Sequence, residues 1–239
     1  MDNKKYIEKL EALEKVSKIP KMREDPECYV DTRELLDELF KYLMTVKQDY
    51  GIKWLFGLKR YIQDKKETLR RPFNSHLDRG HIVEVELFGH FSNELTFLHP
   101  AVVLFDDLSG WMLIAPISTS KFSSPNPLHI DVTEEDGLKH PCGIALDSIR
   151  VIDKKRVLYQ HKNEGSNSKL RPAKLDEVDQ TIMQHYLPQL YHRFNKIESE
   201  LNKEREEHEK TKEELRNLQE RIHEYEEVAA GKYLLEKNG

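Results

Sequence analysis

Three short apolar runs lie close together in the middle of the chain and constrain its fold more than any other feature. They span residues 82–87, 101–105 and 112–117. Each is rich in Val, Ile, Leu or Phe, and turn-forming Gly, Asn, Asp and Ser separate them, which is typical of β-strands. In the first run the apolar residues at 83, 85 and 87 alternate with Glu84 and Glu86. We therefore expect that strand to have one face in water.

The segment before these runs is predicted to be a helical N-terminal domain, residues 1–71. Its apolar residues recur at helical spacing, as in Tyr6, Leu10 and Leu13. Its last part is basic, with Lys53, Lys59, Arg60, Lys65, Lys66, Arg70 and Arg71. We favour a solvated helix face as the explanation. The alternative is a basic surface patch that binds the phosphates along a nucleic-acid backbone, because Trp54 and Tyr61 are interleaved with the cations.

The C-terminal part carries a heptad repeat. From Met183 the steps of four and three residues fall on Leu187, Leu190, Phe194, Ile197, Leu201, Glu204, His208, Thr211, Leu215, Leu218, Ile222, Tyr225 and Ala229. Such a stripe is buried only against another helix, so residues 189–239 are predicted to form a coiled-coil helix that self-associates or binds a partner. Pro188 is expected to kink the helix near its start.

Composition and cysteine usage exclude several classes. Charged residues make up 34% of the 239, and 38 Lys and Arg stand against 43 Asp and Glu, which argues against a wholly basic nucleic-acid coat protein. Cys28 and Cys142 lack metal-ligand spacing, so we expect a reduced, cytoplasmic protein without structural zinc. No apolar run approaches the roughly 18 residues of a membrane span, and no cofactor or metal motif is present.

Candidate chemistry gathers around the loop between the first two runs and at the end of the third. The polar residues there are His90, Ser92, Glu94, Thr96, His99, Ser118, Thr119, Ser120 and Lys121. Cleavage of RNA through its own 2′-hydroxyl needs no metal; it needs a base, an acid and donors to the phosphorane. Glu94, His99 and Ser118 or Thr119 supply those residue types.

Residues 79–190 resemble the MazF/PemK family of toxins from toxin-antitoxin systems. The resemblance rests on Arg79-Gly80, the loop with Glu94, the His99–Leu104 run, Ala115–Thr119, Asp136-Gly137, Cys142–Asp147 and Ile149–Asp153. It implies an α+β protein whose domain 72–188 is an SH3-like β-barrel of the MazF, PemK and CcdB type. It further implies a homodimer, formed here through barrel and coiled coil, that cleaves single-stranded RNA without metal and is held in check by an antitoxin.

The resemblance also implies roles for individual residues. The family's loop glutamate falls on Glu94, its catalytic arginine on His99 and its catalytic threonine on Ser118. Histidine loses its charge near neutral pH but serves directly as acid or base, so we expect a pH-dependent rate. Thr96, Thr119, Ser120, Lys121 and Arg79 are the further candidates for substrate binding.

Two other functions remain open from the sequence. The barrel and coiled coil could form a non-catalytic adaptor that binds nucleic acid or protein. Alternatively, the N-terminal helices or the coiled coil could cover the barrel groove, doing within one chain what a separate antitoxin does elsewhere.

Overall fold

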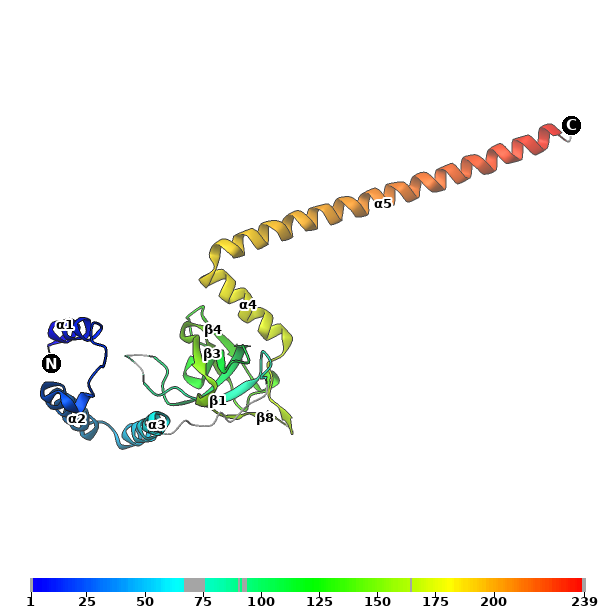
Figure 1. Ribbon diagram of the computed structural model, residues 1–239. Helices are drawn as coiled ribbons and strands as arrows, with labels where there is room; N and C mark the ends of the chain where they lie inside the picture. The colour runs from blue at the N-terminus through cyan, green and yellow to red at the C-terminus, as the bar shows by residue number, and fades with distance from the viewer. Residues whose placement is uncertain (1, 67–75, 90, 92–93, 164, 238–239) are drawn as a thin grey trace.

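A computed structural model describes residues 2–66, 76–89, 91, 94–163 and 165–237. Among these residues, three α-helices precede a small antiparallel sheet and two follow it, as the ribbon in Figure 1 shows. The helices are α1 (Asn3–Leu13), α2 (Pro26–Thr45), α3 (Gln48–Lys66), α4 (Pro172–Tyr186) and α5 (Pro188–Lys237). The class is therefore α+β, with the helical N-terminal region and C-terminal helices that the sequence predicted.

The main sheet has seven antiparallel strands in the order β4-β5-β3-β2-β1-β7, with β6 also paired to β3. The strands are β1 (Ile82–Glu86), β2 (Leu98–Asp106), β3 (Trp111–Ser118), β4 (His129–Val132), β5 (Cys142–Ala145), β6 (Arg150–Asp153) and β7 (Val157–Gln160). A separate hairpin joins β8 (Lys162–Asn163) to β9 (Ser166–Asn167). The three apolar runs of the sequence coincide with β1, β2 and β3.

The expected barrel closure is not found in the described part of the chain. There, β4 and β7 are the two ends of the strand order and are not paired with each other. Instead, β3 divides its outer edge: residues 111–114 pair with β6, and residues 117–118 pair with β5. Because one strand serves two neighbours in succession, the sheet bends without closing through hydrogen bonds.

The two faces of the sheet bury separate apolar clusters, as strand alternation requires. One cluster contains Ile82, Val102 and Ile117 and is covered by α4 through the buried Val178. The other contains Val83, Val85, Val103 and Ile114. Both faces of the central strands are thus covered.

The expectation of a water-exposed face on β1 was wrong. Glu86 is only 7% exposed and accepts a hydrogen bond from the backbone N–H of Phe88 at 2.9 Å. Glu84 is half-buried, with Oε2 2.9 Å from Nε2 of His161. Both glutamates have polar partners, which is why an acidic residue can occupy the covered face.

Helix α3 packs against Phe88, which follows β1, and against Lys155, which follows β6. A Cβ atom at Gly57 would lie 2.2 Å from the ring of Phe88, so only glycine permits this approach. The ring of Trp54 meets that of Phe88 edge-on at 4.9 Å between centroids. Further along α3, Arg60 donates to the carbonyl oxygen of Lys155 at 2.5 Å, and Asp64 pairs with the Lys155 ammonium at 3.1 Å.

The C-terminal helices meet at a sharp break. Leu187 leaves helical geometry (φ −130°, ψ 52°), and α5 begins at Pro188. Proline suits a first helical turn because its missing N–H would have no intrahelical partner there. The proline therefore starts a new helix, whereas the sequence predicted only a kink, and α5 projects away from the sheet (Figure 1).

Candidate active site

The start of β2 brings the predicted catalytic histidine between two other strands. His99 pairs with Val85 of β1. On the other side of β2, Ala101 pairs with Pro116 of β3, and continuing that antiparallel register by two residues sets His99 opposite Ser118. Because directly opposed residues project from the same face of a sheet, their side chains share one face.

The environment of His99 favours a neutral imidazole. Burial lowers its pKa below the ordinary value of 6.5, outweighing a hydrogen bond to the backbone of Ile117 and the negative charge of Glu84, which act in the opposite direction. The ammonium group of Lys53 lowers the pKa further. An imidazole of this kind is unprotonated at pH 7 and can accept a proton.

A cavity of about 410 Å3 is lined by His99 and by residues of the loop that precedes it. Glu94, Thr96 and His99 line one side, together with Glu86. Glu94 is exposed, and its Oε2 accepts the backbone N–H of Phe91 at 3.3 Å. The hydroxyl of Thr96 donates to the carbonyl oxygen of Leu87 at 3.4 Å. The structure thus brings the predicted carboxylate and imidazole to one cavity, with Thr96 tied to the end of the first strand.

Helix α3 forms the other wall of this cavity. Tyr50, Lys53 and Phe56 contribute side chains to it. The ring of Tyr50 meets Phe97 edge-on, with 5.3 Å between centroids. Sequence reasoning did not assign these residues to the site. The sequence signal for them was the basic stretch that begins at Lys53, which we interpreted as a solvated helix face.

The predicted hydroxyl residues lie at the end of β3. Ser118 and Ser120 share a hydrogen bond of 2.9 Å between their Oγ atoms. Thr119, Ser120 and Lys121 form a single 3-10 turn. Its backbone packs so tightly that a Cβ at Gly143 would lie 2.4 Å from the carbonyl oxygen of Lys121. This turn packs against β5. Neither the turn nor Ser118 is among the residues that line the cavity.

Arg79 lies apart from this cluster. It donates to the carbonyl oxygen of Leu104 at 3.1 Å and pairs with Asp179 of α4. Leu104 is near the other end of β2 from His99, so Arg79 here links the sheet to α4. His90 and Ser92 lie outside the described residues.

Two arginines lie close to the loop that carries Glu94. Arg156 donates to the carbonyl oxygens of Glu86 at 3.0 Å and Phe88 at 3.2 Å, which fixes the point where the chain leaves β1. Burial lowers the pKa of Arg150, and the negative charge of Glu94 acts in the opposite direction. Glu94 is therefore within electrostatic reach of Arg150, which sequence reasoning did not assign to the site.

Within the described residues, no group of three or more His, Cys, Asp and Glu side chains is arranged to hold a metal ion. In the same part of the chain, no helix combines the length and apolar character of a membrane span.

Comparison with known proteins identifies the segment that carries this site. Residues 78–186 match the family described as the PemK-like, MazF-like toxin of type II toxin-antitoxin systems. The chain thus contains a MazF/PemK-like segment that includes all seven strands of the main sheet and α4. A search of curated proteins gave no match.

Solved structures of toxins are similar to part of the chain. Mycobacterium tuberculosis toxin MazF-mt6 is 15% identical, with 44% of this chain and 95% of that chain covered and a TM-score of 0.35. MazF (Form-I) from Deinococcus radiodurans is 20% identical, with 46% of this chain and 96% of that chain covered and a TM-score of 0.36. MazE-MazF (Form-II) from Deinococcus radiodurans is 18% identical, with 45% of this chain and 93% of that chain covered and a TM-score of 0.34.

Proposed function

We propose that this chain is a metal-independent endoribonuclease that cleaves single-stranded RNA and acts as the toxin of a toxin-antitoxin pair. The observation that carries the proposal is the cavity in which Glu94 and His99 come together, inside a segment that matches the MazF/PemK family. The antitoxin would be a separate protein. The proposed organisation is a helical unit (1–71), the toxin domain (72–188) and the helix that follows (189–239).

His99 is the proposed general base. Its lowered pKa leaves the imidazole free to take the proton of the 2′-hydroxyl, whose oxygen then attacks phosphorus and displaces the 5′-oxygen. The negative charge of Glu84, which acts on His99, stabilises the imidazolium that forms, and Glu94, on the same cavity, is the second proposed carboxylate. The hydroxyl of Ser118, opposite His99, donates to the phosphorane, and Thr96, Thr119, Ser120 and Lys121 are the proposed neighbouring contacts with RNA.

Lys53 supplies the cation that His99 does not. A neutral imidazole cannot balance the phosphate charge, whereas an ammonium on the facing wall of the cavity can. In this proposal the ammonium of Lys53 also gives a proton to the leaving 5′-oxygen. In this proposal α3 completes the groove rather than covering it.

The first test is cleavage of a long, mixed-sequence single-stranded RNA in EDTA. We expect defined cuts that leave a 2′,3′-cyclic phosphate and a 5′-hydroxyl, because the attacking nucleophile is the RNA's own 2′-hydroxyl. RNA that stays intact between about pH 5 and 9, the window in which histidine changes charge, would favour the adaptor instead. Circular dichroism on the same sample would verify that the protein is folded.

Lys53→Gln tests the contribution of α3. We expect kcat to fall, because the leaving 5′-oxygen loses its proton donor. We also expect KM to rise about tenfold at low salt and the slope of log affinity against log salt to fall by about 0.7, the value for one phosphate contact on single-stranded nucleic acid. Lys59→Gln is the matched control, because Lys59 is an exposed lysine on the same helix that does not line the cavity. Faster cleavage by Lys53→Gln would instead indicate that α3 covers the groove and inhibits the enzyme.

A further inference from the structure

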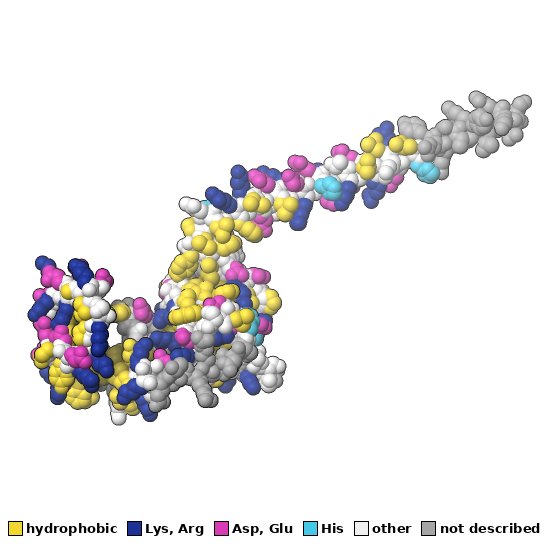
Figure 2. All heavy atoms as spheres, in the orientation of Figure 1, with side chains coloured by type: hydrophobic (Ala, Val, Ile, Leu, Met, Phe, Trp, Pro, Cys, Tyr) yellow, Lys and Arg dark blue, Asp and Glu magenta, His cyan; other side chains and the backbone are white. Residues whose placement is uncertain are grey.

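Helix α5 is continuous over 50 residues, from Pro188 to Lys237, about 75 Å at 1.5 Å per residue. Continuity matters because the steps of three and four residues keep one apolar stripe in phase only if the helix is unbroken through its polar middle. The stripe residues on both sides of that middle are exposed, from 44% for Leu201 to 64% for Ile197. Figure 2 shows hydrophobic side chains gathered where α4 meets α5 and recurring along α5.

We infer that this stripe binds α5 of a second copy of the chain, in a parallel and in-register two-stranded coiled coil. In the heptad abcdefg, Phe194, Leu201, Leu215 and Ile222 take position a, with His208 between Leu201 and Leu215. Position d takes Leu190, Ile197 and Leu218, with Glu204 and Thr211 in the middle. The g and e positions flank this seam and set the orientation of the two helices.

The flanking charges fit the parallel arrangement. There, each g residue faces the e residue five positions later on the other helix. The resulting pairs among residues 193–219 are Arg193 with Glu198, Glu200 with Arg205 and Glu207 with Lys212. Each of these pairs joins opposite charges. The next g–e pair, Glu214 with Gln219, favours neither the parallel nor the antiparallel orientation.

The antiparallel arrangement brings g residues together instead. When the stripe from Leu190 to Ile222 overlaps fully with its copy, Arg193 would face Arg221, Glu200 would face Glu214, and Glu207 would face its own copy. All these contacts join like charges, and only Glu198 with Lys212 among the e residues would offset them. Like-charge contacts disfavour a wrong pairing even where attractive surface pairs contribute little.

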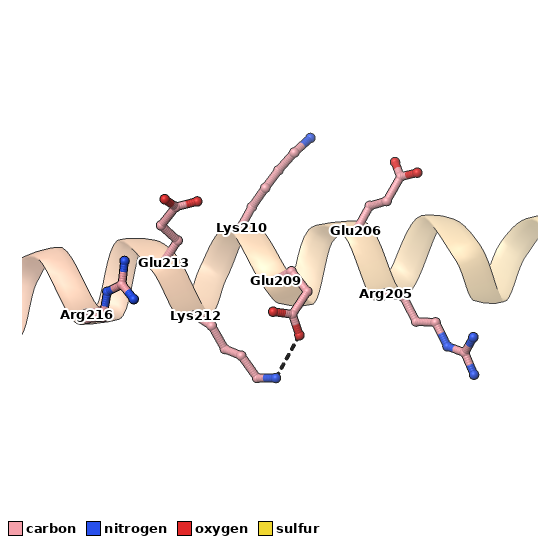
Figure 3. Close-up of a pocket in the computed structure, with 7 residues that line it drawn as sticks. All are labelled: Arg205, Glu206, Glu209, Lys210, Lys212, Glu213 and Arg216. Carbon is pink, nitrogen blue, oxygen red and sulfur yellow. Dashed lines mark hydrogen bonds and ion pairs between the residues drawn. The ribbon is translucent and has the colours of Figure 1, made fainter.

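The charged side chains of α5 lie where this arrangement needs them. Figure 3 shows Arg205 and Lys212, both at position e, on one side of the helix, and Glu206 and Glu213 on the other. In the single chain, Lys212 pairs with Glu209 of its own helix at 2.7 Å. Both partners are well exposed, so this contact can be exchanged for Glu207 of the second copy.

The polar middle selects the register. Glu204, His208 and Thr211 occupy three successive seam positions. An in-register pair puts these residues against one another, whereas a shift by one heptad would bury some of them against leucine or isoleucine. Polar seam residues thus give specificity at some loss of stability.

Parallel pairing has a consequence for the toxin-like segment. Helix α4 is anchored to the sheet by the buried Val178, and Tyr186 donates to the carbonyl oxygen of Leu146 at 2.8 Å. Because α5 starts directly after α4, the pairing brings two candidate active sites to the same end of one coiled coil.

The test is oxidative cross-linking of the full-length chain carrying Leu218→Cys. Position d residues meet their own copies only in a parallel, in-register pair, so we expect a disulfide-linked dimer in high yield. Glu213→Cys, on the outer side of the same helix, is the matched control and should cross-link poorly. This readout reports on α5 even if the sheets also associate, and it does not depend on RNA cleavage. Failure of Leu218→Cys to cross-link would overturn the inference.

Charge reversal provides a second test of orientation. In the Leu218→Cys background, Glu200→Lys with Glu207→Lys should lower the yield at least severalfold, and so should Arg205→Glu with Lys212→Glu. Mixing the two variants should restore it, because every reversed contact becomes attractive again. Undiminished cross-linking by either variant alone would contradict the proposed pairing, and circular dichroism would verify that α5 stays helical.

Discussion

Replacing His99 with alanine is expected to lower the rate of RNA cleavage by about 10²–10⁴-fold, the range for removal of a general base. The loss should fall mainly on kcat, because the imidazole acts on the 2′-hydroxyl in the transition state and contributes little to binding RNA. His140→Ala is the matched control, since His140 is exposed in a turn and does not line the cavity. Equal cleavage by both variants would remove His99 from the mechanism.

The pH profile gives an independent readout of the same residue. A base acts in its unprotonated form, so the wild-type rate should rise with pH through the pKa of His99 and then level off. Because burial lowers that pKa, the midpoint should lie below the ordinary value of 6.5. The residual rate of His99→Ala should not show this rise with pH. A wild-type rate that falls as pH rises through this range would assign His99 the role of acid.

Lys154→Met is expected to destabilise the fold by about 3–5 kcal/mol, the range for breaking a buried ion pair on one side. The side chains of Lys154 and Asp106 are only 3% and 0% exposed, and Nζ lies 2.5 Å from Oδ2. Asp106 also accepts the backbone N–H groups of Leu77 at 2.8 Å and Leu108 at 3.1 Å. Removing the ammonium leaves a buried carboxylate that methionine cannot compensate.

The neighbouring lysine provides the control for this measurement. Lys155 pairs with Asp64 in a partly exposed contact, with side chains 24% and 33% exposed, so Lys155→Met should cost about 1 kcal/mol or less. Urea unfolding of both variants would measure the difference. Similar losses for the two would show that burial of the Lys154 pair is not what stabilises it.

Acid should weaken the same pair. Burial raises the pKa of Asp106, but the hydrogen bonds from Lys154 and from the backbone N–H groups of Leu77 and Leu108 together hold that pKa below its ordinary 3.8. A carboxyl with a lowered folded pKa stabilises the native state above its unfolded pKa. That contribution is lost as pH falls from about 3.8 through the folded value.

Much of the fold was predictable because local rules decide it. Runs of β-branched and apolar residues predicted β1, β2 and β3, and Leu190 to Ile222 predicted a long helix. The water-exposed face of β1 was predicted wrongly. Alternation shows where side chains point, but the covering of Glu84 and Glu86 comes from His161 and from the chain beyond β1, which no local pattern contains.

The sequence by itself determined the segment that matches the toxin family, the residue types at Glu94, His99 and Ser118, and the heptad phase of α5. Only the tertiary structure decided that β3 divides its edge between β5 and β6, and that α3 packs beside the end of β1 so that Lys53 shares a cavity with His99. The reason is physical: helix and strand patterns depend on contacts a few residues apart. Lys53 and His99 are brought together by packing such as that of Gly57 on Phe88, between segments distant in the chain.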